Sequence, residues 1–358
     1  MRRQSWLLGT VVALLLIVGP AAGGQGGSNG GADLAGAIAV QERHTPRLLA
    51  VPGVVGTGVS LDESGRPEIV VLLEASDVAG LPSALDGISV STKVTGPVSA
   101  LHHREGHEKG GGNGGGGGGG DEVDLTQRFD RPVPIGVSSG NAQSEVDGIV
   151  VAVCSAGTYG ARVVDAGGTV YALSNNHVYA HENLADPGSA IVQPGLAETN
   201  CIADPNDAIG SLHAFVPLQP SGNRADAAIA ISTTSLIGDS TPADGYGTPK
   251  SQTVAAEVGM AVQKYGRTTN LTTGAVDVVN LTVIVQYTTG PKVFEGQIGV
   301  EASRGNSFVE GGDSGSLMVT NTRESVGLVF AGNDDGSLGV ANPIDEVLGA
   351  FGVTIDGA

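Results

Sequence analysis

From about residue 131 to residue 358 the sequence consists of short apolar runs separated by turns rich in Gly, Asn and Asp. Examples are GIVVAVCS, DAAIAIS, GAVDVVNLTVIVQYT, KVFEGQIGVEAS and SVGLVFAG. Runs this short and closely spaced predict β-strands, because helices need longer periodic segments. Only PIDEVLGAFG, near the C-terminus, has the acidic first turn of a helix. We therefore predict an all-β domain over residues 131–358, built as a sandwich or a pair of barrels.

A smaller unit over residues 32–100 precedes this domain. ADLAGAIAVQERH has apolar residues at helical spacing, and Thr45 with Pro46 predicts the cap and first position of a second short helix. GVVGTGVSL, RPEIVVLLE and GISVSTKVTG predict three strands, and SDVAGLPSAL predicts a short helix. The segment is predicted to be a small α+β domain.

The two units are joined by residues 101–124, in which three histidines precede a long glycine tract. Glycine loses the most backbone entropy on ordering and has no side chain to bury, so this segment is predicted to be a linker. His102, His103 and His107 could bind a metal ion. No fixed geometry is expected for them, and a solvated tract is favoured.

The N-terminal residues, 1–23, have the pattern of a signal peptide. Two arginines precede an apolar core, and small residues follow around Ala22 and Gly23. We expect export and removal of this segment, with an uncleaved anchor as the alternative. The mature protein is then secreted, to the extracellular medium or the cell envelope.

Charge and cysteine content narrow the partners and the compartment. The formal net charge of −19 disfavours binding to nucleic acid and to anionic membranes. The chain has two cysteines, Cys154 and Cys201. In an exported protein this pair predicts one disulfide, closing a loop that contains His177, and two separate buried thiols are the alternative.

The motif GGDSGSL places Ser314 among three glycines. A serine hydroxyl needs a base within hydrogen-bond reach to act as a nucleophile. Glycines at positions 311, 312 and 315 permit a tight turn that directs backbone amides at one point, as stabilisation of an oxyanion requires.

Three histidines of the β domain are candidates for the base. His177 follows the strand-like TVYALSN and is expected at a strand end facing a cleft. His213 lies within the strand-like IGSLHAF, where a structural role is favoured, and His181 is expected on an exposed loop. Asp226 directly precedes the apolar run AAIAI, so its carboxylate would be costly to bury without donors. An exposed strand-start aspartate is the alternative.

Together, LSNNHV around His177, ADAAIA around Asp226 and GGDSGSL around Ser314 resemble the three signatures of chymotrypsin-like serine proteases, in the same order. VQKYGRTTNLTTGAV and SVGLVFAGNDDGSLGVANPI extend the resemblance over most of residues 148–352. It implies two six-stranded antiparallel β-barrels, and a secreted bacterial-type member with an N-terminal accessory or propeptide-like domain.

The resemblance also implies roles for individual residues. His177 would be the general base, Asp226 its orienting acid and Ser314 the nucleophile, with the amides of Gly312 and Ser314 as the oxyanion hole. Phe308, Phe330 and Gly332 would line the substrate pocket. Phe308 stands where an acid would select a basic side chain, so an apolar or small residue is expected before the scissile bond.

Several positions depart from the family pattern. Ser174, Asn175 and Asn176 replace Thr, Ala and Ala before the histidine, and Val178 replaces a cysteine after it. Phe330 stands where a serine commonly supports the buried aspartate, so a backbone group or water would have to compensate. VPIGVSSG, over residues 133–140, only weakly resembles the N-terminus of an activated zymogen.

The predicted function is a serine endopeptidase acting on proteins or peptides, with no cofactor and no metal. A catalytically inactive binding or adhesion protein on the same scaffold is the alternative, since fold does not fix function. Cleavage in the glycine-rich linker would release the small domain, unless that domain is a permanent accessory. The sequence leaves the oligomeric state open.

Overall fold

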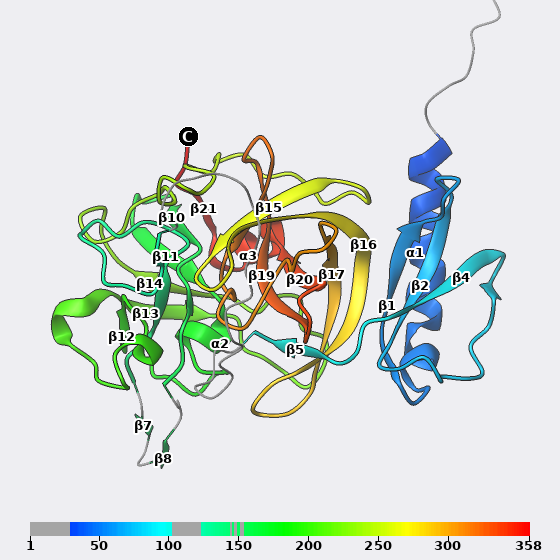
Figure 1. Cartoon of the computed structure of the whole chain (residues 1–358), viewed down its shortest axis with the longest axis horizontal. Helices are drawn as coiled ribbons and strands as arrows, with labels where there is room; N and C mark the ends of the chain where they lie inside the picture. The colour runs from blue at the N-terminus through cyan, green and yellow to red at the C-terminus, as the bar shows by residue number, and fades with distance from the viewer. Residues whose placement is uncertain (1–28, 102–122, 144, 147–148, 151–153) are drawn as a thin grey trace, which may run out of the picture.

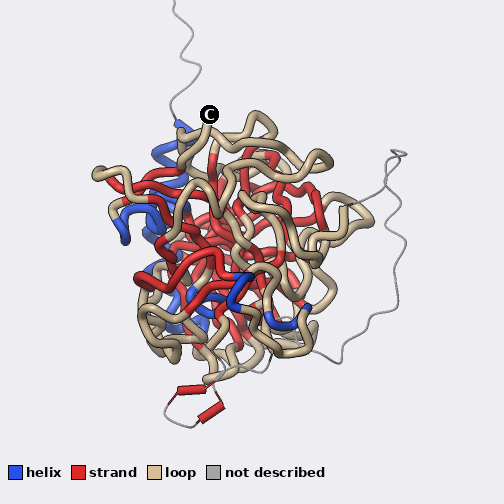
Figure 2. Tube along the Cα trace, turned by 90° about the vertical axis from the view of Figure 1, so that its left-hand side faces the viewer, coloured by secondary structure: helices blue, strands red, loops and turns tan. Residues whose placement is uncertain are grey.

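The computed structural model describes residues 29–101, 123–143, 145–146, 149–150 and 154–358. The predicted signal peptide (1–23) lies outside these residues, as does most of the predicted linker, including His102, His103 and His107. Within the described part of the chain, no helix is both long enough and apolar enough to cross a membrane. Figure 2 shows the strands concentrated in the interior of the molecule, with loops around them.

The C-terminal part of the chain forms a closed six-stranded barrel. Its strands pair in the order β15-β18-β19-β20-β17-β16, and β15 also pairs with β16 to close the ring. The strands are β15 (Ala261–Gly266), β16 (Asn270–Gln286), β17 (Lys292–Ala302), β18 (Leu317–Thr320), β19 (Ser325–Asn333) and β20 (Leu338–Pro343). All these neighbours run antiparallel.

A second curled sheet precedes it in the chain and has the order β21-β10-β11-β14-β13-β12-β6-β9. Edge strand β9 runs into β10 through two residues, so the sheet curls back on itself. Its strands are β6 (Ser138–Asn141), β9 (Gly157–Thr158), β10 (Ala161–Asp165), β11 (Val170–Ser174), β12 (Ala190–Val192), β13 (Ala208–Phe215), β14 (Ala228–Ile231) and β21 (Val353–Ile355). The predicted fold class, all-β with two barrels after a small α+β domain, is confirmed.

Short elements complete this part of the chain. The predicted C-terminal helix is present as α3 (Ile344–Phe351), whose C-cap is Gly352 in the left-handed region. The others are α2 (Asn176–Tyr179), the 3₁₀ turns η1 (Leu196–Glu198) and η2 (Pro205–Asp207), and the paired strands β7 (Glu145–Val146) and β8 (Ile149–Val150), which project from the lower edge in Figure 1.

The N-terminal domain packs one helix, α1 (Asn29–Leu49), on a small sheet of β1 (Val54–Leu61), β2 (Pro67–Leu73), β3 (Ala84–Leu85) and β4 (Ile88–Val94). The three predicted strands are present. In β2, Ile69 and Val71 face the cluster under α1, whereas Val70 and Leu72 join the core of the C-terminal barrel. Burial on both faces explains why this strand reads as a continuous apolar run.

Two helix predictions in this domain are wrong. Thr45 does not cap a second helix, because its hydroxyl donates to the Gln41 carbonyl (2.8 Å) and bonds the Thr57 hydroxyl, and α1 continues through Pro46. This back-bond within α1 and the buried tertiary bond to Thr57 outweigh the local capping preference. The segment SDVAGLPSAL is not helical, since Gly80 has a left-handed φ of +83° and Pro82 has no N–H to donate.

The N-terminal domain shares its sheet with the barrel. β1 pairs antiparallel with β16, so the ten strands from β15 to β3, together with β5 off this path, form one eleven-stranded sheet. Figure 1 shows the domain beside β16. Lys93 on β4 bonds Asp277 and Glu301 on the barrel, both at 2.8 Å. Asn280 on β16 donates to Gln41 on α1 (2.9 Å). The junction therefore combines backbone pairing, buried apolar surface and an ion-pair network.

Gly58 allows this close approach, which gives a first prediction. A Cβ at position 58 would come within 2.2 Å of Val278 Cγ1 and 3.2 Å of the Val279 carbonyl oxygen. We expect Gly58→Val to lower the free energy of unfolding by about 1–3 kcal/mol through overpacking. Gly36→Ala is the control, because position 36 is exposed on α1 and a Cβ at this position has no atom within 4 Å. It should be neutral or stabilise by up to about 1 kcal/mol. Denaturant titration measures both, and equal effects would contradict the tight junction.

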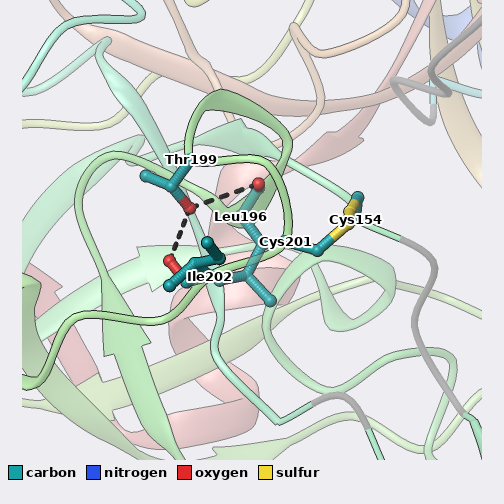
Figure 3. The surroundings of a disulfide bond; sticks show 5 residues. All are labelled: Cys154, Leu196, Thr199, Cys201 and Ile202. Atoms are coloured by element: carbon teal, nitrogen blue, oxygen red, sulfur yellow. Dashed lines mark hydrogen bonds between the residues drawn. A yellow bond between two sulfur atoms is a disulfide. The ribbon is translucent and has the colours of Figure 1, made fainter.

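The predicted disulfide is present. Cys154 and Cys201 are bonded, with their Cα atoms 5.0 Å apart, and no free cysteine remains. The Cys201 N–H donates to the Leu196 carbonyl, which also accepts from the Thr199 hydroxyl (Figure 3). The bond closes a loop with a sequence separation of 47 that contains His177.

Closing a loop of this length predicts a stabilisation of about 4 kcal/mol in the chain-entropy model. We expect reduction of the native protein to lower its melting temperature by several degrees, as followed by circular dichroism. The Cys154→Ser/Cys201→Ser double variant should melt at the lower temperature with or without reductant. A native protein whose melting is insensitive to reductant would refute this stabilisation.

Candidate active site

His177 and Asp226 come together because their strands are neighbours. β11 ends just before α2, which carries His177, and it pairs with β14 so that Ser174 lies opposite Ala228. Asp226 stands two residues before that partner. His177 Nδ1 lies 2.5 Å from Asp226 Oδ2, and the His177 N–H donates to Asp226 Oδ1 at 3.2 Å. Both side chains are almost fully buried, with 1% and 0% exposed.

The buried carboxylate has a further donor, Tyr287, whose hydroxyl lies 2.6 Å from Asp226 Oδ2. Burial alone raises the pKa of Asp226, but the opposing effects of His177 and of the Tyr287 hydrogen bond outweigh it and lower the pKa. Phe330, which stands at the usual serine position, does not fill this role. Its ring packs 4.7 Å from that of Phe294, which stacks on Tyr287 at 5.9 Å.

The unusual asparagines before His177 are structural. Asn175 donates to the Asp226 backbone carbonyl (2.7 Å), and Asn176 donates to the Val216 carbonyl (2.7 Å). The Asp226 N–H in turn donates to Asn342 Oδ1 at 3.1 Å. These bonds fix the segment just before His177 and both the N–H and the carbonyl of Asp226.

Ser314 lies on the C-terminal barrel, in the loop before β18. Its hydroxyl donates to the Phe330 carbonyl (3.1 Å), and its own carbonyl accepts from Thr158 of β9 (2.7 Å). Gly315 has a φ of +93°, and a Cβ there would come within 2.2 Å of Ser174 Oγ, three residues before His177. The serine loop of one barrel therefore packs directly on the histidine strand end of the other.

A second buried carboxylate holds this loop. Asp313 forms an ion pair with Lys264 (3.2 Å) in which neither side chain is exposed. It also accepts from the Thr269 hydroxyl (2.7 Å) and the Glu310 N–H (2.9 Å). Burial raises the pKa of Asp313, but Lys264 and these hydrogen bonds outweigh it and lower the pKa. Burial also lowers the pKa of Lys264.

The weak zymogen resemblance at VPIGVSSG gains no support from the fold. Val133 is fully buried, and its N–H donates to the Leu236 carbonyl at 2.9 Å. Lys264, within the sequence AVQKYG, forms the ion pair with the buried Asp313 carboxylate. The carboxylate next to Ser314 in the sequence is therefore paired with a lysine side chain.

The predicted oxyanion and pocket residues lie around Leu101, the residue after β5 (Val98–Ala100). The Gly312 N–H donates to the Leu101 carbonyl at 2.8 Å, and Gly312 has a φ of +103°. Phe308 lies with Leu101 in one apolar cluster. A Cβ at Gly332 would lie 3.3 Å from Leu101 Cδ2. Phe330 faces this site through its carbonyl, while its ring lies in a different cluster.

The other two histidines of the β domain lie elsewhere. His213 is exposed on β13, with its ring 5.1 Å from that of Tyr171. The expectation of an exposed His181 is wrong, because His181 is 5% exposed and its Nε2 lies 3.0 Å from the Gln143 carbonyl oxygen. Its loop is covered because the neighbouring Glu182 accepts from Thr288 and Thr289. Among the described residues, no three His, Cys, Asp or Glu side chains are grouped as for a metal ion.

Residues 224–349, which include Asp226 and Ser314, match the family model of Peptidase family S64. The match covers about a third of the chain and coincides with most of the closed barrel. Over these residues the chain is similar to a peptidase family. This confirms the predicted resemblance, together with the two-barrel strand topology.

Solved peptidase structures are also similar to this chain. Thermobifida fusca Protease A shares 20% identity over 57% of this chain and 92% of its own, with a TM-score of 0.41. A glutamic acid-specific serine protease with a histidine triad in substrate binding shares 20% identity over 62% and 100%, with a TM-score of 0.44. Cellulomonas bogoriensis chymotrypsin shares 18% identity over 64% and 100%, with a TM-score of 0.41. All three TM-scores are below 0.5, so the fold assignment rests on the strand pairing.

Tyr287 and Lys264 are the residues of the candidate site that the sequence motifs miss. Tyr287 directly follows the end of β16, and Lys264 lies within β15, so each is surrounded by residues that read as ordinary strand. The one local signal is the position of Lys264 within an apolar strand. A lysine that is buried there needs a buried partner of opposite charge. Nothing in the sequence near Tyr287 points to Asp226, 61 positions away.

The Tyr287 contact predicts a pH-dependent loss of stability in Tyr287→Phe. Because the pKa of Asp226 is lowered on folding, its ionised form stabilises the fold above its ordinary value of 3.8. That contribution is lost as the pH falls through the lower pKa of the folded state. Removing a hydrogen bond to a charged group should cost about 1.5–3 kcal/mol at neutral pH.

Denaturant titrations at neutral and acid pH measure this effect. The difference between native protein and Tyr287→Phe should shrink as Asp226 becomes protonated in acid. Tyr179→Phe is the matched control, because the buried Tyr179 hydroxyl bonds only the neutral Ser139 hydroxyl in the described structure (3.0 Å). Its effect should not depend on pH. A Tyr287→Phe effect that is equally independent of pH would exclude the proposed support of the Asp226 charge.

Proposed function

We propose that this protein is a secreted serine endopeptidase that hydrolyses peptide bonds in proteins or peptides. The observation that carries the proposal is the buried contact of His177 Nδ1 with Asp226 Oδ2, on one barrel, at the junction with the Ser314 loop of the other. A histidine is held there by a buried acid, on the barrel against which the glycine-rich loop of Ser314 packs. This arrangement suits nucleophilic acyl transfer.

Each residue then has one chemical role. Ser314 attacks the carbonyl carbon of the scissile bond and gives its proton to His177, which passes it to the leaving amine. Asp226 fixes the histidine tautomer and stabilises the imidazolium, and its lowered pKa suits this role because it stays ionised. The Gly312 amide, with that of Ser314, donates to the developing oxyanion. The reaction needs no cofactor or metal.

Export is supported by two independent features. The first 23 residues have a basic start, an apolar core and a small-residue exit, the pattern of a cleaved signal. The disulfide between Cys154 and Cys201 persists in oxidising compartments and is rare in the cytosol. The net charge of −19 argues against nucleic acid and anionic membranes as partners after the signal is removed.

The proposal predicts that a serine-directed phosphonate probe labels the protein at Ser314 after prolonged incubation. Ser314→Ala should abolish labelling and lower peptidase turnover by about 10⁴-fold or more. Ser316→Ala is the matched control, since Ser316 is also buried, two residues along the same loop, and its hydroxyl has no hydrogen-bond partner in the described structure. Mass spectrometry locates the adduct.

Two outcomes would oppose this assignment. Labelling that survives Ser314→Ala would remove the serine from its role as nucleophile. A folded native protein that neither reacts with the probe nor hydrolyses any peptide would favour the inactive binding protein on the same scaffold.

A further inference from the structure

The segment that follows α2 has an unusual backbone. His181, Glu182 and Asn183 are three consecutive residues in the left-handed region, with φ of 49°, 57° and 78°. Residues other than glycine adopt this region uncommonly, and they keep it where surrounding contacts hold it in place. Glu182 lies in the middle of the three, five residues after His177. The contacts of this segment therefore bear on the position of the histidine.

Asn183 ties the segment to the barrel that carries His177. The Asn183 side chain donates to the Leu218 carbonyl (2.8 Å) and accepts from the Leu218 N–H (2.8 Å). The Asn183 N–H donates to Asn176 Oδ1 (3.0 Å), and Asn176 directly precedes His177 in α2. The backbone from which the Glu182 side chain projects is thereby fixed relative to the histidine.

The Glu182 carboxylate binds the turn between β16 and β17, on the other barrel. Its Oε1 accepts from the Thr288 N–H (3.0 Å), and its Oε2 accepts from the Thr289 N–H (2.8 Å) and from the Thr289 hydroxyl. The Gly290 N–H closes the turn by donating to the Tyr287 carbonyl (3.2 Å). Glu182 is buried, so these charge-assisted bonds are shielded from water. One carboxylate thus holds both central amides of the turn.

The first residue of that turn is Tyr287, the residue that supports Asp226. Its hydroxyl lies 2.6 Å from Asp226 Oδ2, the oxygen that is also 2.5 Å from His177 Nδ1. The Tyr287 ring is edge-on to the His177 ring, with 5.9 Å between their centroids. The amide that Glu182 binds at Thr288 directly follows Tyr287 in the chain. A displacement of the turn would therefore displace the hydroxyl on Asp226.

Resting on the proposed function, we propose that Glu182 is a positioning residue of the reaction. By binding the turn that begins at Tyr287, it holds the Tyr287 hydroxyl on Asp226, and the aspartate in turn holds His177. The histidine and Glu182 belong to one segment, so a single stretch of backbone sets both the base and the support of its acid. Without the carboxylate the turn is free to move away from that segment. A displacement of about 1 Å at a reacting group can cost about 100-fold in rate.

The rate at which the phosphonate probe labels Ser314 in the full chain tests the proposal. We expect Glu182→Ala to lower the maximal labelling rate by about 10- to 100-fold, because the base is misplaced. The probe concentration that gives half the maximal rate should stay within about twofold, because Glu182 does not act on probe binding. Unfolding would instead lower the labelled fraction. Glu182→Gln keeps the volume and one acceptor oxygen, so its rate should lie between those of the native protein and Glu182→Ala.

Asp165→Ala is the matched control. Asp165 also holds a hairpin turn, since its Oδ1 accepts from the N–H groups of Gly167 (2.8 Å) and Thr169 (2.9 Å), and its Oδ2 accepts from the Tyr171 hydroxyl (3.1 Å). This turn lies at the end of β11 opposite to Ser174. The control should lower the melting temperature but leave the labelling rate within about twofold of the native rate, because distant sites act independently.

A double-mutant cycle with Tyr287→Phe decides whether Glu182 acts through the tyrosine hydroxyl. In the Tyr287→Phe background that route is absent, so Glu182→Ala should lower the labelling rate by less than about threefold more. The same cycle with Glu182→Gln decides the question if Glu182→Ala does not fold.

Two results would overturn this inference alone. One is a Glu182→Ala labelling rate within about twofold of the native rate, which would leave Glu182 a purely structural role. The other is a cycle in which the two effects multiply. An NMR signal from the proton between His177 Nδ1 and Asp226 gives a readout that does not depend on the probe: it should shift in Glu182→Ala and in Tyr287→Phe, and stay in place in Asp165→Ala. Absence of labelling in the native protein would instead defeat the proposed function.

Discussion

The site depends on the burial of two carboxylates that must stay ionised. Neither Asp226 nor Asp313 has exposed side-chain surface, and an isolated buried carboxylate would be too costly to keep charged. Asp226 is satisfied by His177 and Tyr287, and Asp313 by Lys264, Thr269 and Glu310. Each acid thereby fixes one half of the site, the histidine on one barrel and the serine loop on the other. A buried carboxylate is stable only when its hydrogen-bond donors and its cation lie within bonding distance. The two aspartates therefore restrict the positions of the surrounding residues more strictly than apolar packing does.

β16 extends this organisation beyond the barrels. It spans Asn270–Gln286, longer than barrel closure with β15 requires, and its later part pairs with β1. The same strand also pairs with β5 and is followed directly by Tyr287. One continuous element therefore links the N-terminal domain, β5 and the support of Asp226. Changes in the docking of that domain have a short structural route to Asp226.

The sequence predicted the features whose signals are local. Strand-length apolar runs, the glycines around Ser314 and the paired cysteines each determine a nearby structure, and all three are found in the fold. Thr45 and Pro46 misled because the cap preference is local, while the bond from Thr45 to Thr57 on β1 is tertiary. Tyr287, Lys264 and Leu101 were missed for the same reason. Each acts on a partner that is distant in sequence and adjacent only after folding.

Leu101 lies where the N-terminal domain meets the Ser314 loop. Its carbonyl oxygen accepts from the Gly312 N–H, and its N–H donates to the Phe330 carbonyl, which also accepts from the Ser314 hydroxyl. The preceding strand β5 pairs with β16 and β19, and β16 also pairs with β1. Backbone pairing through β16 therefore connects the docking of the N-terminal domain with the position of Leu101 beside the Ser314 loop.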